Sequence, residues 1–131
     1  MTTDHLKLYT WGYSGHTQAD LFDLMTEHQI DLVVDVRQRP WSHEERWRKA
    51  ALTASFGDSY RHLPELGNST RSAQRVQLVN EERGLARLEG LLQIHRRVLI
   101  ICVERDHSRC HRSYVAQRMQ ERIEGLEVAH L

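Results

Sequence analysis

Two apolar segments constrain the fold of this chain more than any other feature of its sequence. Residues 30–36 and 98–103 consist mainly of Val, Ile and Leu, and β-branched residues of this kind favour strands. Successive side chains of a strand point to opposite faces of a sheet, so a strand that is apolar on both faces has to be covered on both. The segment at 30–36 is therefore predicted to lie in the middle of a parallel sheet.

Strand-like and helix-like segments alternate along the rest of the chain. Further strands are predicted at residues 6–11, 60–63 and 126–131, and helices at 18–28, from Ser42 to about 55, at 81–95 and at 110–123. Thr17 and Asp20 are spaced as a capping box for the first helix. This order predicts an α/β three-layer domain with a mainly parallel sheet of about five strands and helices on both faces. Residues 66–73, rich in Gly, Asn, Ser and Thr, are expected to form a mobile loop.

Length, charge and cysteine content narrow the class of protein. A chain of 131 residues predicts a single domain, residues 1–131. The 18 basic residues equal the 18 acidic ones, which does not favour coating of nucleic acid by bulk charge but leaves a local basic groove open. No apolar run reaches the length of a membrane span, and no signal-peptide pattern is present. We therefore expect a cytoplasmic protein without a structural disulfide, in which Cys102 is a small buried residue of a strand.

Ligands of parallel α/β sheets bind beyond the carboxyl ends of the strands, so the residues that follow each strand are candidates. After the first strand, Ser14 is able to donate to an anion, although a plain turn explains the same Gly-rich segment. After the second, Asp35 and Arg37 point the same way. They form a structural ion pair, or Asp35 orients Arg37 toward a ligand or acts as a general base. Arg39 is the freer arginine, and Glu65 after the third strand is either a loop carboxylate or a solvated surface residue.

The segment after the fourth strand carries the most reactive side chains. Glu104 is followed by Cys110, His111 and Arg112. If Ser108 caps the next helix, Arg109, Cys110 and His111 lie in its first turn, where unpaired N–H groups favour an anion or a thiolate. Cys110 is then a candidate nucleophile, with His111, His107 or Glu104 as acid or base. The alternative is that Cys110 packs inward while Arg112 pairs with an acidic residue.

Two familiar cysteine motifs are absent. A phosphatase pattern would place an arginine six positions after Cys110, where the chain has Ala116. A zinc site would need a second pair of ligands at metal-binding spacing. The sequence therefore predicts neither a metal nor a cofactor. Trp41 and Trp47 are expected to pack in the core rather than to mark a partner surface.

Several motifs stand in order along nearly the whole chain: Tyr9-Thr10-Trp11-Gly12-Tyr13-Ser14, Val34-Asp35-Val36-Arg37 with Pro40, Leu63-Pro64-Glu65-Leu66-Gly67, and Cys102-Val103-Glu104-Arg105-Asp106 with Cys110-His111-Arg112. With these motifs the chain resembles the prokaryotic family catalogued as domain of unknown function 488. The resemblance implies the fold and the position of the site, but no settled activity. One departure is Tyr13, which stands where the family has a histidine, so the role of that imidazole is not carried over unless His16 substitutes.

Together these features predict a pocket for a phosphate-type anion at the carboxyl ends of the strands. The leading hypothesis is an enzyme, a hydrolase or transferase, that acts on a nucleotide, a nucleic-acid end or a phosphorylated small molecule. The candidate catalytic residues are Cys110, Asp35, Glu104 and His111, and the candidate substrate-binding residues are Ser14, Arg37, Arg39, Glu65 and Arg112. The alternatives are a non-catalytic nucleotide- or nucleic-acid-binding module and a redox-responsive cysteine protein. No membrane partner is expected, and the oligomeric state is left open.

Overall fold

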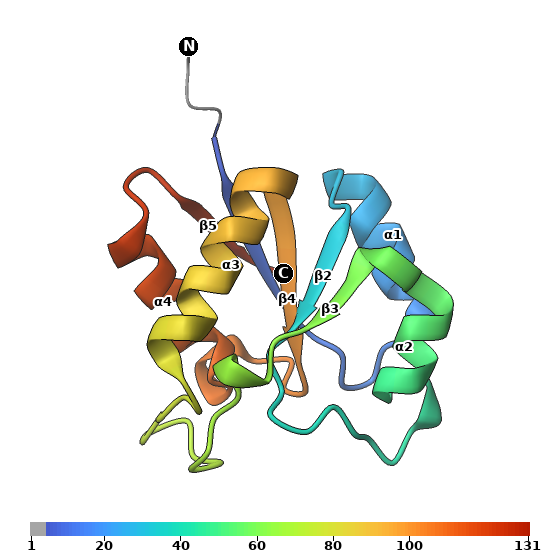
Figure 1. Ribbon diagram of the computed structural model, residues 1–131. Helices are drawn as coiled ribbons and strands as arrows, with labels where there is room; N and C mark the ends of the chain where they lie inside the picture. The colour runs from blue at the N-terminus through green and yellow to red at the C-terminus, as the bar shows by residue number, and fades with distance from the viewer. Residues whose placement is uncertain (1–4) are drawn as a thin grey trace.

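The computed structural model describes residues 5–131 and contains a five-stranded sheet in which every pairing is parallel. The strand order is β3-β2-β4-β1-β5, which places β4 in the centre. The strands are β1 (Lys7–Gly12), β2 (Leu32–Asp35), β3 (Tyr60–His62), β4 (Arg97–Cys102) and β5 (Glu127–His130). Four helices connect them: α1 (Gln18–His28), α2 (Lys49–Phe56), α3 (Glu81–His95) and α4 (Arg112–Arg122). Helices α1 and α2 cover one face of the sheet, and α3 and α4 cover the other (Figure 1).

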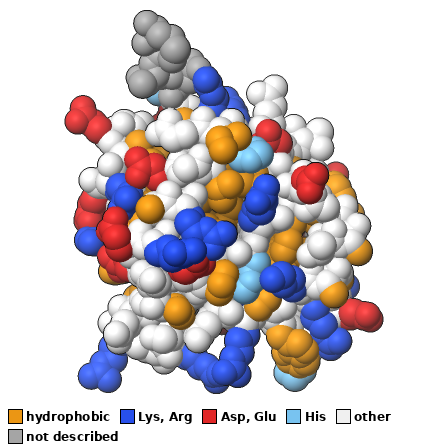
Figure 2. Space-filling view, in the orientation of Figure 1, with side chains coloured by type: hydrophobic (Ala, Val, Ile, Leu, Met, Phe, Trp, Pro, Cys, Tyr) orange, Lys and Arg blue, Asp and Glu red, His pale blue; other side chains and the backbone are white. Residues whose placement is uncertain are grey.

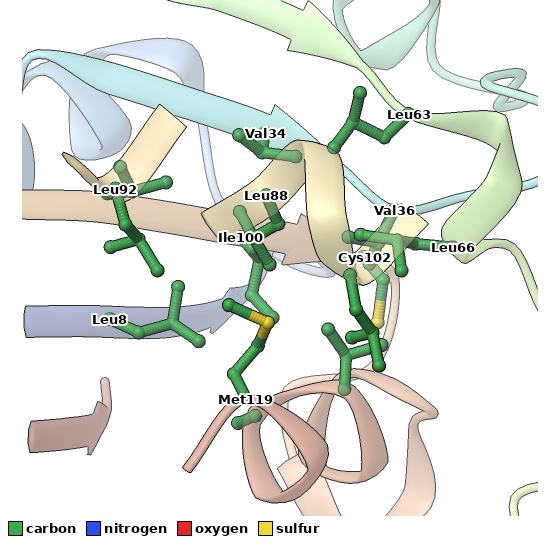
Figure 3. Close-up of a cluster of buried hydrophobic side chains, with 14 of the residues drawn as sticks. Leu8, Val34, Val36, Leu63, Leu66, Leu88, Leu92, Ile100, Cys102 and Met119 are labelled. Carbon is green, nitrogen blue, oxygen red and sulfur yellow. The ribbon is translucent and has the colours of Figure 1, made fainter. Parts of the chain in front are cut away.

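Side chains that alternate along the strands divide the core into two halves. In β4, Val98 and Ile100 pack on the side of α3 and α4, whereas Leu99 and Ile101 pack on the side of α1 and α2. Figure 3 shows the first half, in which Leu88 of α3 and Met119 of α4 face the sheet, together with Leu8, Val34, Val36, Leu63, Leu66, Leu92, Ile100 and Cys102. The two-sided burial of the central strands confirms the three-layer α/β prediction.

The helices show how much of the local structure follows from the sequence. Helix α1 has the predicted capping box, in which Thr17 accepts from the backbone of Asp20 and the Asp20 carboxylate accepts from the backbone of Thr17. Helix α3 has the predicted bounds, with Asn80 as its N-cap. The predicted start of the second helix at Ser42 is wrong. Ser42 accepts from the backbone of Glu44, a short 3₁₀ turn follows at 45–47, and α2 begins only at Lys49. No helix within residues 5–131 is long and apolar enough to cross a membrane.

The carboxyl edge of the sheet is closely packed. A Cβ atom on Gly12, the last residue of β1, would overlap the carbonyl group of Glu104. The backbone of Tyr13 donates to the carbonyl of Cys102, and that of Ser14 donates to the carbonyl of Val103, each at 3.0 Å. The segment after β4 is therefore held directly against the end of β1.

Replacing Gly12 by Ala should destabilise the protein by about 3 kcal/mol, because the added methyl group meets backbone that cannot move aside cheaply. The matched control is Gly90→Ala in α3, where a Cβ atom meets open space. That change should stabilise the protein by up to about 1 kcal/mol through helix propensity. Urea unfolding of both variants measures the difference, and equal stabilities would contradict the close approach at Gly12.

Candidate functional site

A cavity of about 380 Å³ lies where β2 and β4 end. Three segments line it: the residues after β2, the loop that includes Asn68 and Arg71, and the residues from the end of β4 to His111. The charged lining residues among those described are four arginines and one carboxylate, namely Arg37, Arg39, Arg71, Arg109 and Glu104. Figure 2 shows Lys and Arg side chains along the lower edge of this face, which is the side where the strands end in Figure 1.

Asp35 and Arg37 form a buried bidentate ion pair. The Arg37 Nε and Nη2 atoms donate to the two Asp35 oxygens at 2.9 and 2.7 Å. Tyr60 donates its hydroxyl to Asp35 at 2.6 Å, and the remaining Arg37 nitrogen donates to the Tyr13 hydroxyl at 2.9 Å and to the Trp41 carbonyl. Four of the five N–H donors of Arg37 are therefore engaged within the protein.

Burial and the Asp35 carboxylate shift the pKa values of Arg37 and Tyr60. Burial alone would lower the pKa of Arg37, but the Asp35 carboxylate outweighs it and raises that pKa above its ordinary value. Burial and the same carboxylate raise the pKa of the Tyr60 hydroxyl. Tyr13 accepts from Arg37 and stacks on Trp47. His16 contacts Asp20 and Trp11 and does not take part in this network.

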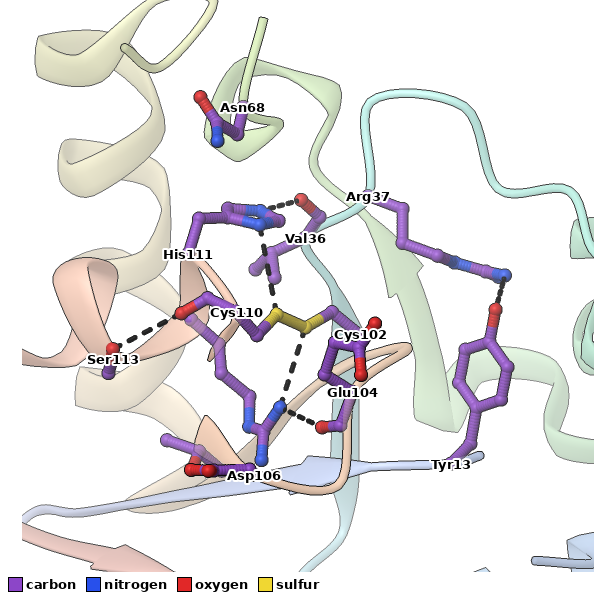
Figure 4. The surroundings of a disulfide bond; sticks show 12 residues. Tyr13, Val36, Arg37, Asn68, Cys102, Glu104, Asp106, Cys110, His111 and Ser113 are labelled. Carbon is purple, nitrogen blue, oxygen red and sulfur yellow. Dashed lines mark hydrogen bonds between the residues drawn. A yellow bond between two sulfur atoms is a disulfide. The ribbon is translucent and has the colours of Figure 1, made fainter. Parts of the chain in front are cut away.

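The two cysteines meet at the cavity wall. Cys102 ends β4 and Cys110 lies eight residues later, and their sulfurs are joined in a disulfide (Figure 4). The expectation of no structural disulfide is therefore wrong. The reason is that the chain turns back after β4, so that Cys110 returns to the same core half as Cys102. Cys102 is buried as expected.

The helix after Cys110 begins later than predicted. A 3₁₀ turn at 107–109 precedes it, with its start capped by Asp106 rather than Ser108, and α4 begins at Arg112. Cys110 therefore lies before the helix, and its backbone N–H donates to the carbonyl of His107. The predicted activation of Cys110 by the first turn of the helix is wrong.

His111 is fixed from two sides. Its Nε2 atom is 2.7 Å from the carbonyl oxygen of Val36, and since a carbonyl only accepts, this nitrogen carries the proton. The Nδ1 atom is left as an acceptor and lies 3.8 Å from the Cys110 sulfur (Figure 4). Burial lowers the pKa of His111, which favours this neutral form. The two sulfurs and one ring nitrogen of His111 all lie within 4.8 Å of one another.

Arg112 is fully buried and holds the turn after β4. It donates to the carbonyl groups of Glu104 and Arg105, and one of its nitrogens lies 3.6 Å from the Cys102 sulfur. Among residues 5–131, no carboxylate forms an ion pair with it, and its Nε has no hydrogen-bond partner. Burial lowers the pKa of Arg112 to about 10. The predicted pairing of Arg112 with an acidic side chain is replaced by donation to backbone oxygens.

The other candidate residues lie apart from the cavity wall. Ser14 is exposed in the turn after β1. Glu65 accepts from Arg83 and Arg87 at 3.1 and 2.7 Å, and its side chain is only 13% exposed, so it is not a solvated surface residue. Of the predicted site residues, the cavity wall brings together Arg37, Arg39, Glu104, Cys110 and His111.

Several lining residues were missed in the sequence, and three of them carry a charged or aromatic side chain. Arg71 lies in the loop that composition marks only as polar, and Arg109 precedes the Cys-His-Arg triplet that drew attention instead. Trp41 is 54% exposed at the cavity wall, where the Arg48 guanidinium lies 5.0 Å from its ring. The expectation of core packing is confirmed for Trp47 and wrong for Trp41.

The fold and the site define a small α/β protein whose distinctive residues gather at the carboxyl edge of a parallel sheet. The family model described as domain of unknown function DUF488 matches residues 17–119, and the chain belongs to this family. No curated protein and no solved structure matches the chain.

Replacing Asp35 by Asn should cost about 3–5 kcal/mol, because it leaves the buried Arg37 guanidinium without its counter-charge. Tyr60→Phe is the control, since it removes one hydrogen bond to the same carboxylate and should cost about 1.5 kcal/mol. The free energy of unfolding in urea measures both. A cost for Asp35→Asn no larger than that for Tyr60→Phe would contradict a buried ion pair that stabilises this edge.

Proposed function

We propose that the cavity at the carboxyl edge binds a phosphate-type anion carried by a nucleotide or a phosphorylated small molecule. The observation that carries the proposal is the excess of arginine over carboxylate among the lining residues. Guanidinium groups match phosphate geometry with two parallel hydrogen bonds, which favours arginine where such groups are bound.

The individual arginines differ in what they offer a ligand. Arg37 already donates four of its five N–H groups to Asp35, Tyr13 and Trp41. Arg39 and Arg71 are exposed and, within residues 5–131, form no ion pair. The anion is therefore bound by Arg39 and Arg71, with Arg109 beside them, while Asp35 and Arg37 fix the segment from which Arg39 extends.

The half-exposed ring of Trp41 supports a nucleotide over a bare phosphate. An indole at the wall of an arginine-lined cavity offers a face on which a nucleobase stacks. The volume of about 380 Å³ is in the range of small-molecule pockets.

A second candidate function is catalysis on the bound ligand. It is favoured by the contact between the Cys110 sulfur and the unprotonated nitrogen of His111, a nucleophile–base arrangement. In this account an external dithiol first reduces the disulfide. His111 then accepts the Cys110 proton, and the sulfur forms a bond to the phosphorus of the ligand while the ester oxygen leaves with a proton from Glu104. Water later hydrolyses the sulfur–phosphorus bond. Asp35 acts by positioning Arg37. The test is turnover of a nucleotide panel by reduced protein, which Cys110→Ser should abolish.

The binding proposal predicts that Arg39→Gln and Arg71→Gln each weaken nucleotide binding about tenfold, which corresponds to about 1.4 kcal/mol per arginine. Isothermal calorimetry on the oxidised protein, with a metal chelator present, measures the affinities for a nucleoside monophosphate, inorganic phosphate and the free nucleoside. Binding should weaken as salt is added, because the exposed charges are screened. Trp41→Ala should weaken the nucleotide but not phosphate.

The matched control is Arg75→Gln, an exposed arginine of the same loop as Arg71 that does not line the cavity. It should leave the affinity unchanged. Equal affinities in Arg39→Gln, Arg71→Gln and Arg75→Gln would refute the assignment of the anion to this cavity, as would the absence of binding to any of the anions.

A further inference from the structure

We propose that Cys102, Cys110 and His111 form a zinc-binding site when the disulfide is reduced, with one coordination position left open toward the cavity. The sequence did not predict a metal, because Cys110 and His111 lack a partner pair at metal-binding spacing. The third ligand, Cys102, comes from the end of β4 and meets the other two only in the folded chain. This inference goes beyond anion binding and does not depend on it.

The spacing of the three ligand atoms suits one ion. Zinc binds thiolate sulfur at about 2.3 Å and imidazole nitrogen at about 2.0 Å, so two sulfurs on a tetrahedral ion lie about 3.8 Å apart. The three ligand atoms lie within 4.8 Å of one another. The Cα atoms of the two cysteines are 7.2 Å apart. The backbone therefore leaves room for the sulfurs to separate around an ion.

The surroundings support the ligands in the way that metal sites require. Histidine ligands commonly donate their second ring nitrogen to a carbonyl or carboxylate, which fixes the ring and its tautomer. His111 does this through Nε2 to Val36, and its Nδ1 faces the Cys110 sulfur (Figure 4). Asn68, on the opposite wall of the cavity, lies on the far side of the His111 ring from the sulfurs (Figure 4).

Arg112 provides an independent argument for negative charge on the sulfurs. Its guanidinium is fully buried and lies 3.6 Å from the Cys102 sulfur. Asp106 and Glu104 act on it only at longer range, because within residues 5–131 neither carboxylate forms an ion pair with it. A buried cation is costly unless an anion compensates it. A free thiolate at Cys102 supplies that anion, and a zinc-bound thiolate sulfur still accepts the Arg112 N–H, which a disulfide sulfur does only weakly.

Before zinc binds, an external dithiol has to reduce the disulfide. The dithiol gives two electrons and two protons to the disulfide and itself becomes a disulfide, which leaves Cys102 and Cys110 as thiols. Zinc then displaces one proton from each thiol, so that the ion and two thiolates are together neutral. Because all three ligand residues line the cavity, the fourth position is open to water or to an oxygen of the bound anion. While zinc holds Cys110, this thiolate is not free to act as the nucleophile of the second candidate function.

The experiment adds Co²⁺ and then Zn²⁺ to reduced, metal-free protein in the absence of phosphate. Wild-type protein should bind one equivalent of Co²⁺ with sulfur-to-cobalt charge-transfer absorption and the visible bands of tetrahedral coordination, and Zn²⁺ should displace it. Cys102→Ser, Cys110→Ser and His111→Gln should each weaken binding by about a hundredfold. His107→Asn, a histidine of the same turn that is outside the three-residue group, should bind as the wild type does.

Two wild-type measurements keep the test decisive if a variant fails to fold. Zinc should protect both thiols of the reduced protein from alkylation, as read by mass spectrometry, and should shift the Nδ1 resonance of His111 in a long-range ¹H–¹⁵N spectrum. Absence of charge-transfer absorption in the reduced wild type, or thiols that alkylate equally fast with and without zinc, would overturn the proposal. The zinc test contains no phosphate, and the calorimetry of the arginine variants contains no free metal. A negative result in one experiment therefore does not affect the proposal that the other one tests.

Discussion

All five strands of this sheet run in the same direction, so the segments that follow them are gathered at one edge. The constraint is strict because the central strands are apolar on both faces and are covered by helices on both. Residues far apart in the chain, such as Arg37 after β2 and Cys110 after β4, line one cavity for this reason. The location of the site is therefore a consequence of how the core is buried.

Two buried guanidinium groups give this edge its rigidity, and each is compensated differently. Arg37 has a carboxylate, Asp35, and two hydroxyl groups complete the network around the pair. Arg112 has backbone carbonyls and a cysteine sulfur instead. The first arrangement is complete within the protein. The second has carboxylates, Asp106 and Glu104, only at longer range. The proposed zinc site rests in part on this difference between the two arginines.

The sequence predicted the secondary structure that residue spacing determines. It missed the contacts between residues that come together only in the folded chain. The capping box of α1, the bounds of α3 and the alternation of strands and helices follow from residue spacing. The start of α4 did not, because the turn after β4 is held by Asp106 and by close packing on Gly12, which spacing does not reveal. The pairing of Cys102 with Cys110 and the inward contacts of Arg112 have the same origin. Trp41 was misplaced because an aromatic side chain has the same local pattern in a core and at a cavity wall.

The most direct test of the central claim is to map the ligand site by NMR. A nucleoside monophosphate added to ¹⁵N-labelled protein should shift the side-chain Nε–H signals of Arg39, Arg71 and Arg109 and the backbone amides of residues 37–41 and 103–111. Signals around the separate hollow beside α1, lined by His16, Asp20 and Glu27, should stay in place. Shifts confined to that hollow, or none at the carboxyl edge of the sheet, would contradict the account.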